Sequence, residues 1–372
     1  MKRRRENSLE EQECRQVESV KRWGESRKAD DRDPSSRSVP HEDDELVTID
    51  DISQGLERIA VPARFFRSDV SRLSEFKYVV HSVIPSKDTT RTVKAESYYP
   101  GCTCRDGCPV TEDKNVDDGC SCGDSRGYPY VISTTTGNNI FHNNHLRQPT
   151  SSPPPSPIYE CNATCTCPPS CQRRVVQYGV AARLEVRSMP HKGMGVVAME
   201  DIERGRFVCE YAGEILGKVQ RDEVWRKIRV ARIKAASTSD VSSTDTEVYD
   251  PAMHNYALTV LEHAGETVYR TTVDAQWVSN VGRFVNHSCE PNTAMVTVRW
   301  NSPVPAVALV SLGIATGQEV TFGYWGLDGR REKAGVGSSQ EGNEGADEDG
   351  LLRIRCLCGA KSCRGYLPTG DW

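Results

Sequence analysis

The chain lacks several features that define common protein classes. No apolar run approaches the roughly 18 residues that a membrane-spanning helix needs. The first residues, MKRRRENSLEEQ, contain basic side chains but no apolar core, so they do not form a secretory signal. Positive charge is not in excess either, because the net charge is −5, which argues against a general nucleic-acid binder. We find no internal repeat, and we expect neither a membrane protein nor a secreted one.

Hydrophobic residues are also scarce. They make up 37% of the 372 residues, with a mean hydropathy of −0.57, so part of the chain should be unstructured. Dense mixed charge at the start predicts a disordered segment over residues 1–58, and the texture changes near Ile59. Residues 2–5 form a basic cluster that fits either a nuclear address or a solvated terminus.

Cysteine, in contrast, is plentiful. In the reducing cytosol or nucleus, the 15 cysteines are better interpreted as zinc ligands than as disulfides. Nine follow the spacing C-x-C-x3-C, C-x-C and C-x3-C-x-C-x3-C. They are Cys102, Cys104, Cys108, Cys120, Cys122, Cys161, Cys165, Cys167 and Cys171. Three tetrahedral zinc ions need twelve bonds, which six terminal thiolates and three bridging ones supply. We therefore predict a three-zinc cluster, against the alternative of buried free thiols.

A second cysteine motif, C-x-C-x4-C, closes the chain. Cys356, Cys358 and Cys363 are one ligand short of a closed structural zinc site. Cys14 lies in the charged start and Cys209 in an apolar strand, which leaves Cys289 in the stretch RFVNHSCEPN as the fourth ligand. An open catalytic zinc is the alternative, but four thiolates suit a structural ion better.

The pattern of apolar residues favours a mainly β fold. We expect one helix over Gln220 to Ala236, with Val224, Trp225, Ile228 and Ile233 on one side. Strands are expected at the stretch FKYVV, within residues 182–216, and within residues 256–324. Turns are expected at residues 203–205 and 315–317. Polar insertions are expected at about residues 236–250 and at residues 331–350.

Four further stretches carry the chemistry when they are taken together: HKGMGVVA (191–198), CEYAGE (209–214), EVTFGYW (319–325) and RFVNHSCEPN (283–292). Each alone is more often core or turn. Together with the cysteine motifs they resemble SET-domain protein-lysine methyltransferases of the suppressor-of-variegation type. The local sequence is also similar to the SET part of a human SET–transposase fusion protein. The resemblance covers residues from about 60 to the end.

This resemblance implies a mainly β SET-domain (β-clip) fold of short curved sheets with a knot-like C-terminal threading. A cysteine-rich three-zinc pre-SET module and a one-zinc post-SET tail would flank it. The implied divisions are pre-SET 59–181, SET 182–325 with its insertion at about 236–250, a polar insertion 326–351, and post-SET 352–372.

The resemblance also implies S-adenosylmethionine as methyl donor, with zinc as the structural metal. The residues that match the family's cofactor contacts are Lys192, Gly193, Met194, Tyr256, Arg283, Asn286 and His287. Many members have Trp where this chain has Met194. Met194 offers no flat stacking surface, although it can still pack against adenine.

Three aromatic residues match the family's lysine channel: Tyr324 as the catalytic Tyr, Tyr211 as a second channel Tyr, and Phe322 as the residue that limits how many methyl groups fit. The transfer needs in-line positioning and a lysine that has lost its proton, which a dry aromatic channel favours. Phe322 favours di- or trimethylation. Gly323 replaces the usual Asp and is predicted to loosen the strand that holds Tyr324. The residue that caps the channel stays open among Tyr366, Leu367, Pro368 and Trp372.

The sequence thus predicts a nuclear, chromatin-associated enzyme that methylates histone H3, at lysine 9 by family type, with recruiting proteins as partners. Alternatives are lysine 36 or 4, a non-histone protein, or a degenerate SET scaffold. The acidic stretch EGNEGADED either draws in a basic tail or is a solvated loop. A zinc-finger nucleic-acid binder is disfavoured by the charge and the cysteine spacing, so direct nucleic-acid binding is not expected.

Overall fold

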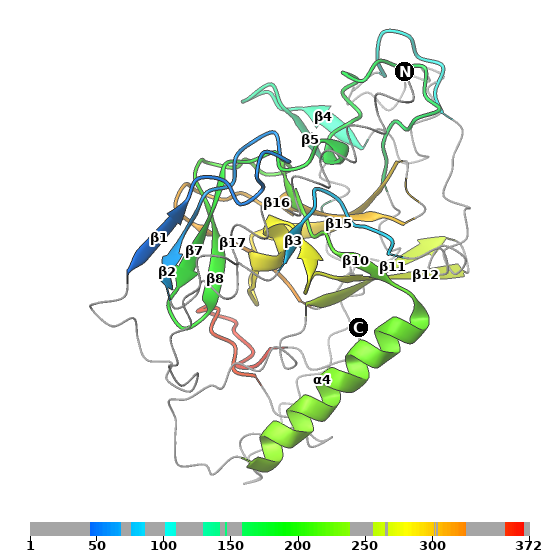
Figure 1. Cartoon of the computed structure of the whole chain (residues 1–372). Coiled ribbons are helices and arrows are strands. Elements are labelled where there is room, and N and C mark those ends of the chain that lie inside the picture. Colours follow the sequence, from blue (N-terminus) through cyan, green and yellow to red (C-terminus); the bar gives the residue numbers. More distant parts are fainter. Residues whose placement is uncertain are drawn as a thin grey trace.

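Short strands dominate the molecule (Figure 1). The computed structural model describes residues 45–67, 76–85, 101–108, 129–141, 146, 158–238, 256–264, 267–300, 302, 304–324 and 354–367. Within these ranges the strands form five small sheets, and a single long helix accompanies them. This confirms the predicted mainly β class. None of the helices in the described ranges is long and apolar enough to cross a bilayer.

The largest sheet brings together segments from the two ends of the described chain. Its strands, in spatial order, are β1 (Leu46–Ile49), β2 (Ala63–Phe66), β7 (Leu184–Met189), β8 (Gly193–Ala198), β17 (Glu319–Phe322) and β14 (Asn286–His287). β7 and β8 form an antiparallel hairpin. β17 lies between β8 and β14, antiparallel to the first and parallel to the second. The sheet therefore places residues 286–287 beside residues 321–322.

The predicted disorder of residues 1–58 is wrong for the stretch from residue 45 onward; residues 1–44 lie outside the described residues. β1 pairs antiparallel with β2. The Asp51 carboxylate then holds a turn, because it accepts the backbone N–H groups of Ser53, Gly55 and Val61 at 2.8–3.0 Å. β2 also pairs with β7, so this part of the expected pre-SET segment belongs to the same sheet as the G-x-G hairpin. Charged residues surround the short apolar stretches, so the composition of this segment did not predict its strands.

Four smaller sheets complete the body. One has the order β6 (Ile158–Tyr159), β15 (Thr293–Arg299), β16 (Ala306–Ser311) and β9 (Phe207–Glu210), and another has the order β10 (Glu214–Leu216), β12 (Thr267–Asp274) and β11 (Ala257–Ala264). Two pairs remain: β13 (Val278–Ser279) with β3 (Lys77–Tyr78), and β4 (Tyr130–Ile132) with β5 (Asn139–Phe141). The stretch FKYVV is therefore a strand at two residues rather than five, because only these two pair with β13.

The predicted helix is present as α4 (Lys218–Thr238), directly after β10. Ile228 is buried, and Val224 and Trp225 are partly buried. Ile233 is 40% exposed, so its predicted place on the same side is wrong. Five residues beyond Ile228, at 3.6 residues per turn, it lies about 140° around the helix. Most of the first expected insertion (about 236–250) and all of the second (326–351) lie outside the described residues.

Candidate active site and metal centres

The G-x-G stretch forms the turn and start of the β7–β8 hairpin. Gly193 has φ +73°, a left-handed conformation that suits glycine. Gly195 serves another purpose: a Cβ there would lie 3.0 Å from Glu319 Oε1 and 3.1 Å from Asn286 Nδ2. The second glycine therefore lets two polar side chains approach the backbone of β8.

Glu319 connects two of the predicted cofactor residues. Its Oε2 lies 2.6 Å from Lys192 Nζ, and its Oε1 accepts a hydrogen bond from Asn286 Nδ2 at 2.8 Å. The same Nδ2 also donates to the Met194 carbonyl at 3.0 Å. Sequence reasoning missed Glu319. The one available signal was its place at the start of the strand that carries Phe322.

Met194 turns its side chain away from this group. The side chain is 6% exposed and packs in the main hydrophobic core, while its carbonyl faces Asn286. The side chain is thus covered by protein atoms, and the backbone of the G-x-G stretch is what lies beside Asn286.

The three predicted channel residues lie together. The rings of Phe322 and Tyr324 have centroids 4.8 Å apart, in agreement with their predicted common face. The Tyr211 ring stands edge-on to Phe322 at 5.5 Å. Gly282 makes room for Tyr211, because a Cβ there would lie 3.0 Å from the Tyr211 Cα. Segments separated by more than 100 residues thus form one aromatic cluster.

Both tyrosine hydroxyls donate hydrogen bonds to backbone carbonyls. Tyr211 donates to the Tyr256 carbonyl at 2.8 Å, and Tyr324 donates to the Val285 carbonyl at 3.2 Å. Burial raises the pKa of both hydroxyls above the usual value of 10.0, so both stay protonated near neutral pH. Each hydroxyl oxygen therefore keeps lone pairs to accept a hydrogen bond, and neither acts readily as a base.

Arg283 is held among aromatic rings. Its Cζ lies 4.5 Å from the Phe76 ring centre and 4.8 Å from that of Tyr256. Its Nε donates to the Ala275 carbonyl at 3.2 Å. Cation–π contacts of this kind fix the guanidinium in place. Phe76 was predicted only as part of a strand, and its contact with Arg283 depends on long-range packing that no local pattern reveals.

His287 lies between the aromatic cluster and the C-terminal cysteines. Its Nδ1 accepts the backbone N–H of Tyr324 at 3.1 Å, and its Nε2 lies 3.4 Å from Cys289 Sγ. Burial, with a smaller contribution from the positive charge of Arg364, lowers the pKa of His287 to about 4. The ring is therefore neutral, and its Nε2–H can donate to the sulfur.

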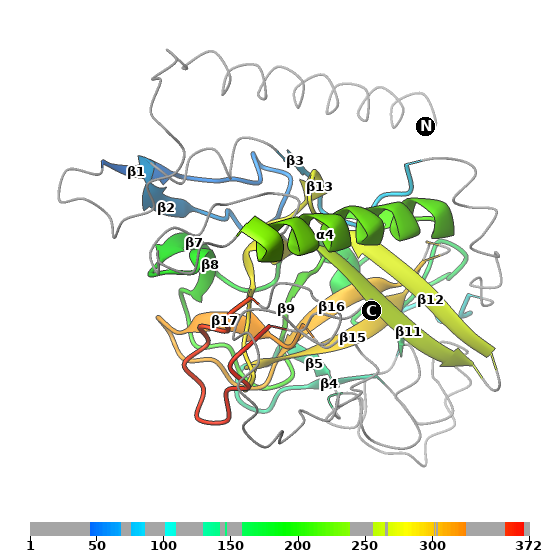
Figure 2. The same cartoon turned by 90° about the horizontal axis from the view of Figure 1, so that it is seen from below.

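The four cysteines proposed for the tail site come together. The Sγ atoms of Cys289, Cys356, Cys358 and Cys363 all lie within 4.8 Å of one another. Backbone N–H groups of Arg364 and Gly365 donate to the sulfurs of Cys289 and Cys363. Four thiols with N–H donors around them fit a tetrahedral zinc ion. The tail passes beside β17, as Figure 2 shows.

Two further contacts fix the tail, but they do not decide which residue caps a channel. Ser362 Oγ donates to Glu290 Oε1 at 2.7 Å, and Leu367 N–H donates to the Ile354 carbonyl at 2.8 Å. Tyr366 is exposed. Pro368 and Trp372 lie outside the described residues.

Seven of the nine pre-SET cysteines are described, and their sulfurs overlap in three groups. The groups are Cys102–Cys161–Cys165–Cys167, Cys108–Cys161–Cys167–Cys171 and Cys102–Cys104–Cys108. Cys102 is shared by the first and third groups, and Cys108 by the second and third, while Cys161 and Cys167 are common to the first two. Such pairwise sharing fits thiolates that bridge three zinc ions. Cys120 and Cys122 lie outside the described residues.

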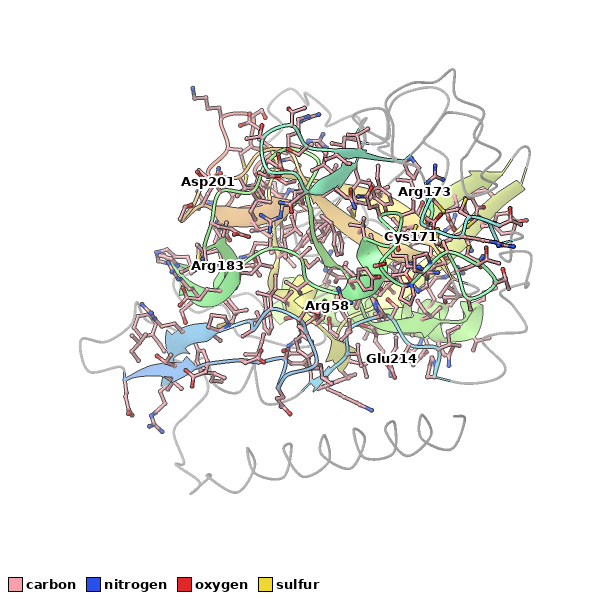
Figure 3. All side chains as sticks on the ribbon, turned by 90° about the horizontal axis from the view of Figure 1, so that it is seen from above. Arg58, Cys171, Arg173, Arg183, Asp201 and Glu214 are labelled. Atoms are coloured by element: carbon pink, nitrogen blue, oxygen red, sulfur yellow. The ribbon has the colours of Figure 1, made fainter. Side chains whose placement is uncertain are left out.

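The surroundings of this cluster suit thiolates. The backbone N–H groups of Cys102 and Cys108 donate to the sulfurs of Cys165 and Cys171, and Arg174 reaches Cys167 Sγ at 3.8 Å. Figure 3 shows Cys171 on the side of the molecule opposite Asp201. Cys209 belongs to neither cysteine group. It is fully buried in β9, where burial raises the pKa of its thiol.

Comparison with known proteins adds two family matches. Residues 193–325 match the SET domain model, and residues 53–174 match the Pre-SET motif model. The cattle protein "Histone-lysine N-methyltransferase SETMAR" is 38% identical over 57% of this chain and 61% of its own length. The Caenorhabditis elegans protein "Probable histone-lysine N-methyltransferase set-23" is 30% identical over 78% of this chain and 95% of its own.

Among solved structures, the methyltransferase domain of human SETMAR is similar to this chain with a TM-score of 0.54. It is 30% identical, and the match covers 86% of this chain and 98% of that domain. This likeness confirms the predicted SET-type fold. The chain spans less than two thirds of the cattle relative's length.

Proposed function

The chain belongs to the histone-lysine N-methyltransferases that join a pre-SET motif to a SET domain, and from this membership we propose that it transfers methyl groups from S-adenosylmethionine to a lysine of histone H3. The observation that carries the proposal is the cluster of Tyr211, Phe322 and Tyr324, in which both phenols already donate their protons to backbone carbonyls. Such a cluster suits a buried lysine amine. Action on histones also implies a nuclear, chromatin-associated protein.

The cofactor would be held beside β8. S-adenosylmethionine, when bound, supplies an electrophilic methyl group. The polar groups present suit such a ligand, because Asn286 and Glu319 lie close to the β8 backbone at Gly195 and Lys192 joins them through its contact with Glu319. Arg283 and Tyr256, with the guanidinium 4.8 Å from the ring centre, are the other two residues proposed to contact the cofactor.

The aromatic cluster would prepare the lysine. The apolar rings disfavour the charged ammonium form, so the amine enters in its nucleophilic state. The hydroxyl oxygens of Tyr211 and Tyr324 have lone pairs left to accept the amine's N–H groups. Hydrogen bonds of this kind would aim the nitrogen lone pair at the methyl group, which is catalysis by positioning.

The degree and site of methylation are the finer parts of the proposal. Phe322 is buried against Tyr211 and Tyr324 and carries no hydroxyl, which leaves room for di- or trimethylation. The resemblance to the suppressor-of-variegation type favours lysine 9 of histone H3. Lysine 36, lysine 4 and a non-histone protein are the alternatives.

Mass spectrometry of histone H3 tail peptides incubated with the protein and S-adenosylmethionine tests the proposal. We expect gains in steps of one methylene on a single lysine. Tyr324→Phe should slow the gain by about 100-fold, because one positioning hydrogen bond is lost. Phe322→Tyr should stop the reaction at a lower methylation degree. Loss of S-adenosylmethionine binding in Tyr324→Phe, measured by calorimetry, would contradict the assigned role.

A degenerate scaffold is the second candidate, and the buried Met194 side chain favours it. A side chain packed in the core adds no stacking surface for a cofactor. Calorimetry separates the two: an intact protein that binds no S-adenosylmethionine is a scaffold, whereas binding without histone methylation points to a non-histone substrate.

A further inference from the structure

Helix α4 differs in charge from the rest of the chain. It contains seven basic and two acidic residues, a net charge of +5, in a chain whose net charge is −5. The charge of the whole chain argued against nucleic-acid binding, but that average conceals a basic helix in an otherwise acidic molecule. The helix is therefore the candidate surface for an anionic partner.

Much of this positive charge faces solvent. The side chains of Arg226 and Lys227 are 63% and 65% exposed, and Lys218 and Arg229 are also exposed. Arg226 and Lys227 share Glu223, which is itself partly exposed. Exposed pairs of this kind contribute little, so they leave the basic side chains available to a partner.

The position of α4 links it to the candidate active site. The helix follows β10, which begins three residues after Tyr211. With 21 residues at 1.5 Å each, it extends about 30 Å from there. Figure 1 shows it along the lower side of the molecule, beginning near β10.

The chemistry of the partner follows from charge. A histone tail is basic, so a basic helix would repel it, and α4 is poorly suited to bind the proposed peptide substrate. In chromatin the tail emerges beside DNA, whose phosphates attract lysine and arginine without regard to sequence. We infer that α4 binds the phosphate backbone of DNA next to the lysine being methylated, an inference that rests on the proposed function.

The exposed aliphatic side chains on α4 are compatible with a second candidate partner, a protein. Val219, Val230 and Ile233 are exposed alongside the basic residues. Such side chains would also suit an acidic protein surface. The excess of positive charge favours phosphate, and separate measurements of binding to DNA and to nucleosomes distinguish the two.

The test compares wild type with the triple variant Arg226→Gln/Lys227→Gln/Arg229→Gln. Binding to a short DNA duplex is measured over a range of salt concentrations, and methylation is measured on H3 peptide and on nucleosomes. The slope of log affinity against log salt should become shallower by roughly 3, about one per lost phosphate contact. Nucleosome methylation should fall about 10-fold or more in kcat/KM, while peptide methylation stays unchanged.

The matched control removes three exposed basic residues outside α4, as Arg64→Gln/Arg67→Gln/Arg183→Gln. It should leave the salt slope and nucleosome methylation close to wild type. An unchanged slope in the α4 variant would overturn the inference. Weaker nucleosome binding with unchanged DNA binding would also overturn it, in favour of an acidic histone surface. If no histone substrate is methylated by wild type, the proposed function fails, and the DNA slope still decides the role of α4.

Discussion

The backbone N–H of Tyr324 donates to Nδ1 of His287 at 3.1 Å, and the other ring nitrogen of His287 lies 3.4 Å from Cys289 Sγ. One imidazole thus connects the proposed catalytic tyrosine to a proposed zinc ligand. Because Tyr324 comes two residues after the end of β17, this bond, the Val285 contact and the Phe322 ring hold it rather than the strand. These contacts account for the position of Tyr324, whether or not Gly323 loosens the strand.

The first prediction concerns His287→Leu. The substitution leaves the Tyr324 N–H without its acceptor, which should cost about 1–3 kcal/mol of stability. It also removes the outer contact of Cys289, which should weaken zinc binding about 10- to 100-fold. Thermal unfolding and zinc release to a chelator measure the two effects. His287→Gln, whose side-chain oxygen can still accept, is the control and should lose less of both. Equal losses in the two variants would show that the hydrogen bonds are not the cause.

A second prediction concerns Glu319. Glu319→Gln keeps an acceptor for Asn286 but removes the charge opposite Lys192, so we expect KM for S-adenosylmethionine to rise about 10-fold, near 1.4 kcal/mol. Glu319→Ala should raise it further. Both substitutions should change kcat less than KM, because Glu319 acts on the cofactor only through Asn286 and Lys192.

Glu200→Gln is the matched control for Glu319, because Glu200 also pairs with a basic residue, Arg206, at 2.9 Å. It should leave KM unchanged. A fall in kcat with unchanged KM in Glu319→Gln would contradict the assignment of Glu319 as a residue that positions Asn286 and Lys192.

The zinc cluster gives a third prediction. Cys161, like Cys102, Cys108 and Cys167, belongs to two of the sulfur groups, and it lies 3.4 Å from Cys108 Sγ, so it is a candidate bridge, whereas Cys171 belongs to one group. Cys161→Ser should therefore release more zinc per chain than Cys171→Ser. Elemental analysis of the purified variants measures this. Equal zinc content in the two variants would argue against the bridging arrangement.

Some of this site follows from sequence because its residues occur in short, dense motifs. The spacing of thiols around zinc is local, so the cysteine groups could be listed, and Cys289 could be proposed by elimination. Alternation along a strand placed Phe322 and Tyr324 on one face. Apolar spacing located α4 to within two residues at each end.

Other features depend on contacts between distant segments. Glu319 meets Lys192 and Asn286 only because β17 lies between β8 and β14. Phe76 meets Arg283 across more than 200 residues. β1 looked disordered because its strand is four residues long and charged residues surround it. Local composition carries no information on such pairings, so the sequence could not predict them.

The last prediction concerns pH and His81. This side chain lies 2.7 Å from Glu210 Oε2 through Nδ1 and 3.2 Å from the Gln177 carbonyl through Nε2. Burial opposes its charge, but the bonds to Glu210 and Gln177 and the charges of Glu210 and Glu57 outweigh burial and raise the pKa of His81 above 6.5. A folded pKa above the unfolded one gives stability that is fully present below about pH 6.5 and is lost as pH rises through the folded pKa.

Urea unfolding at a series of values from about pH 5.5 to about pH 9 measures this effect. The free energy of unfolding of wild type should fall across the upper part of that range. His81→Gln, which cannot become charged, should be less stable than wild type at low pH by about 1–3 kcal/mol and should show a flatter profile. Burial raises the pKa of Glu57 above 4.5. Because Glu57 is present in both proteins, its titration cannot account for the difference between them. Parallel profiles for the two proteins would mean that His81 stays neutral in the fold, with one ring N–H to donate and not two.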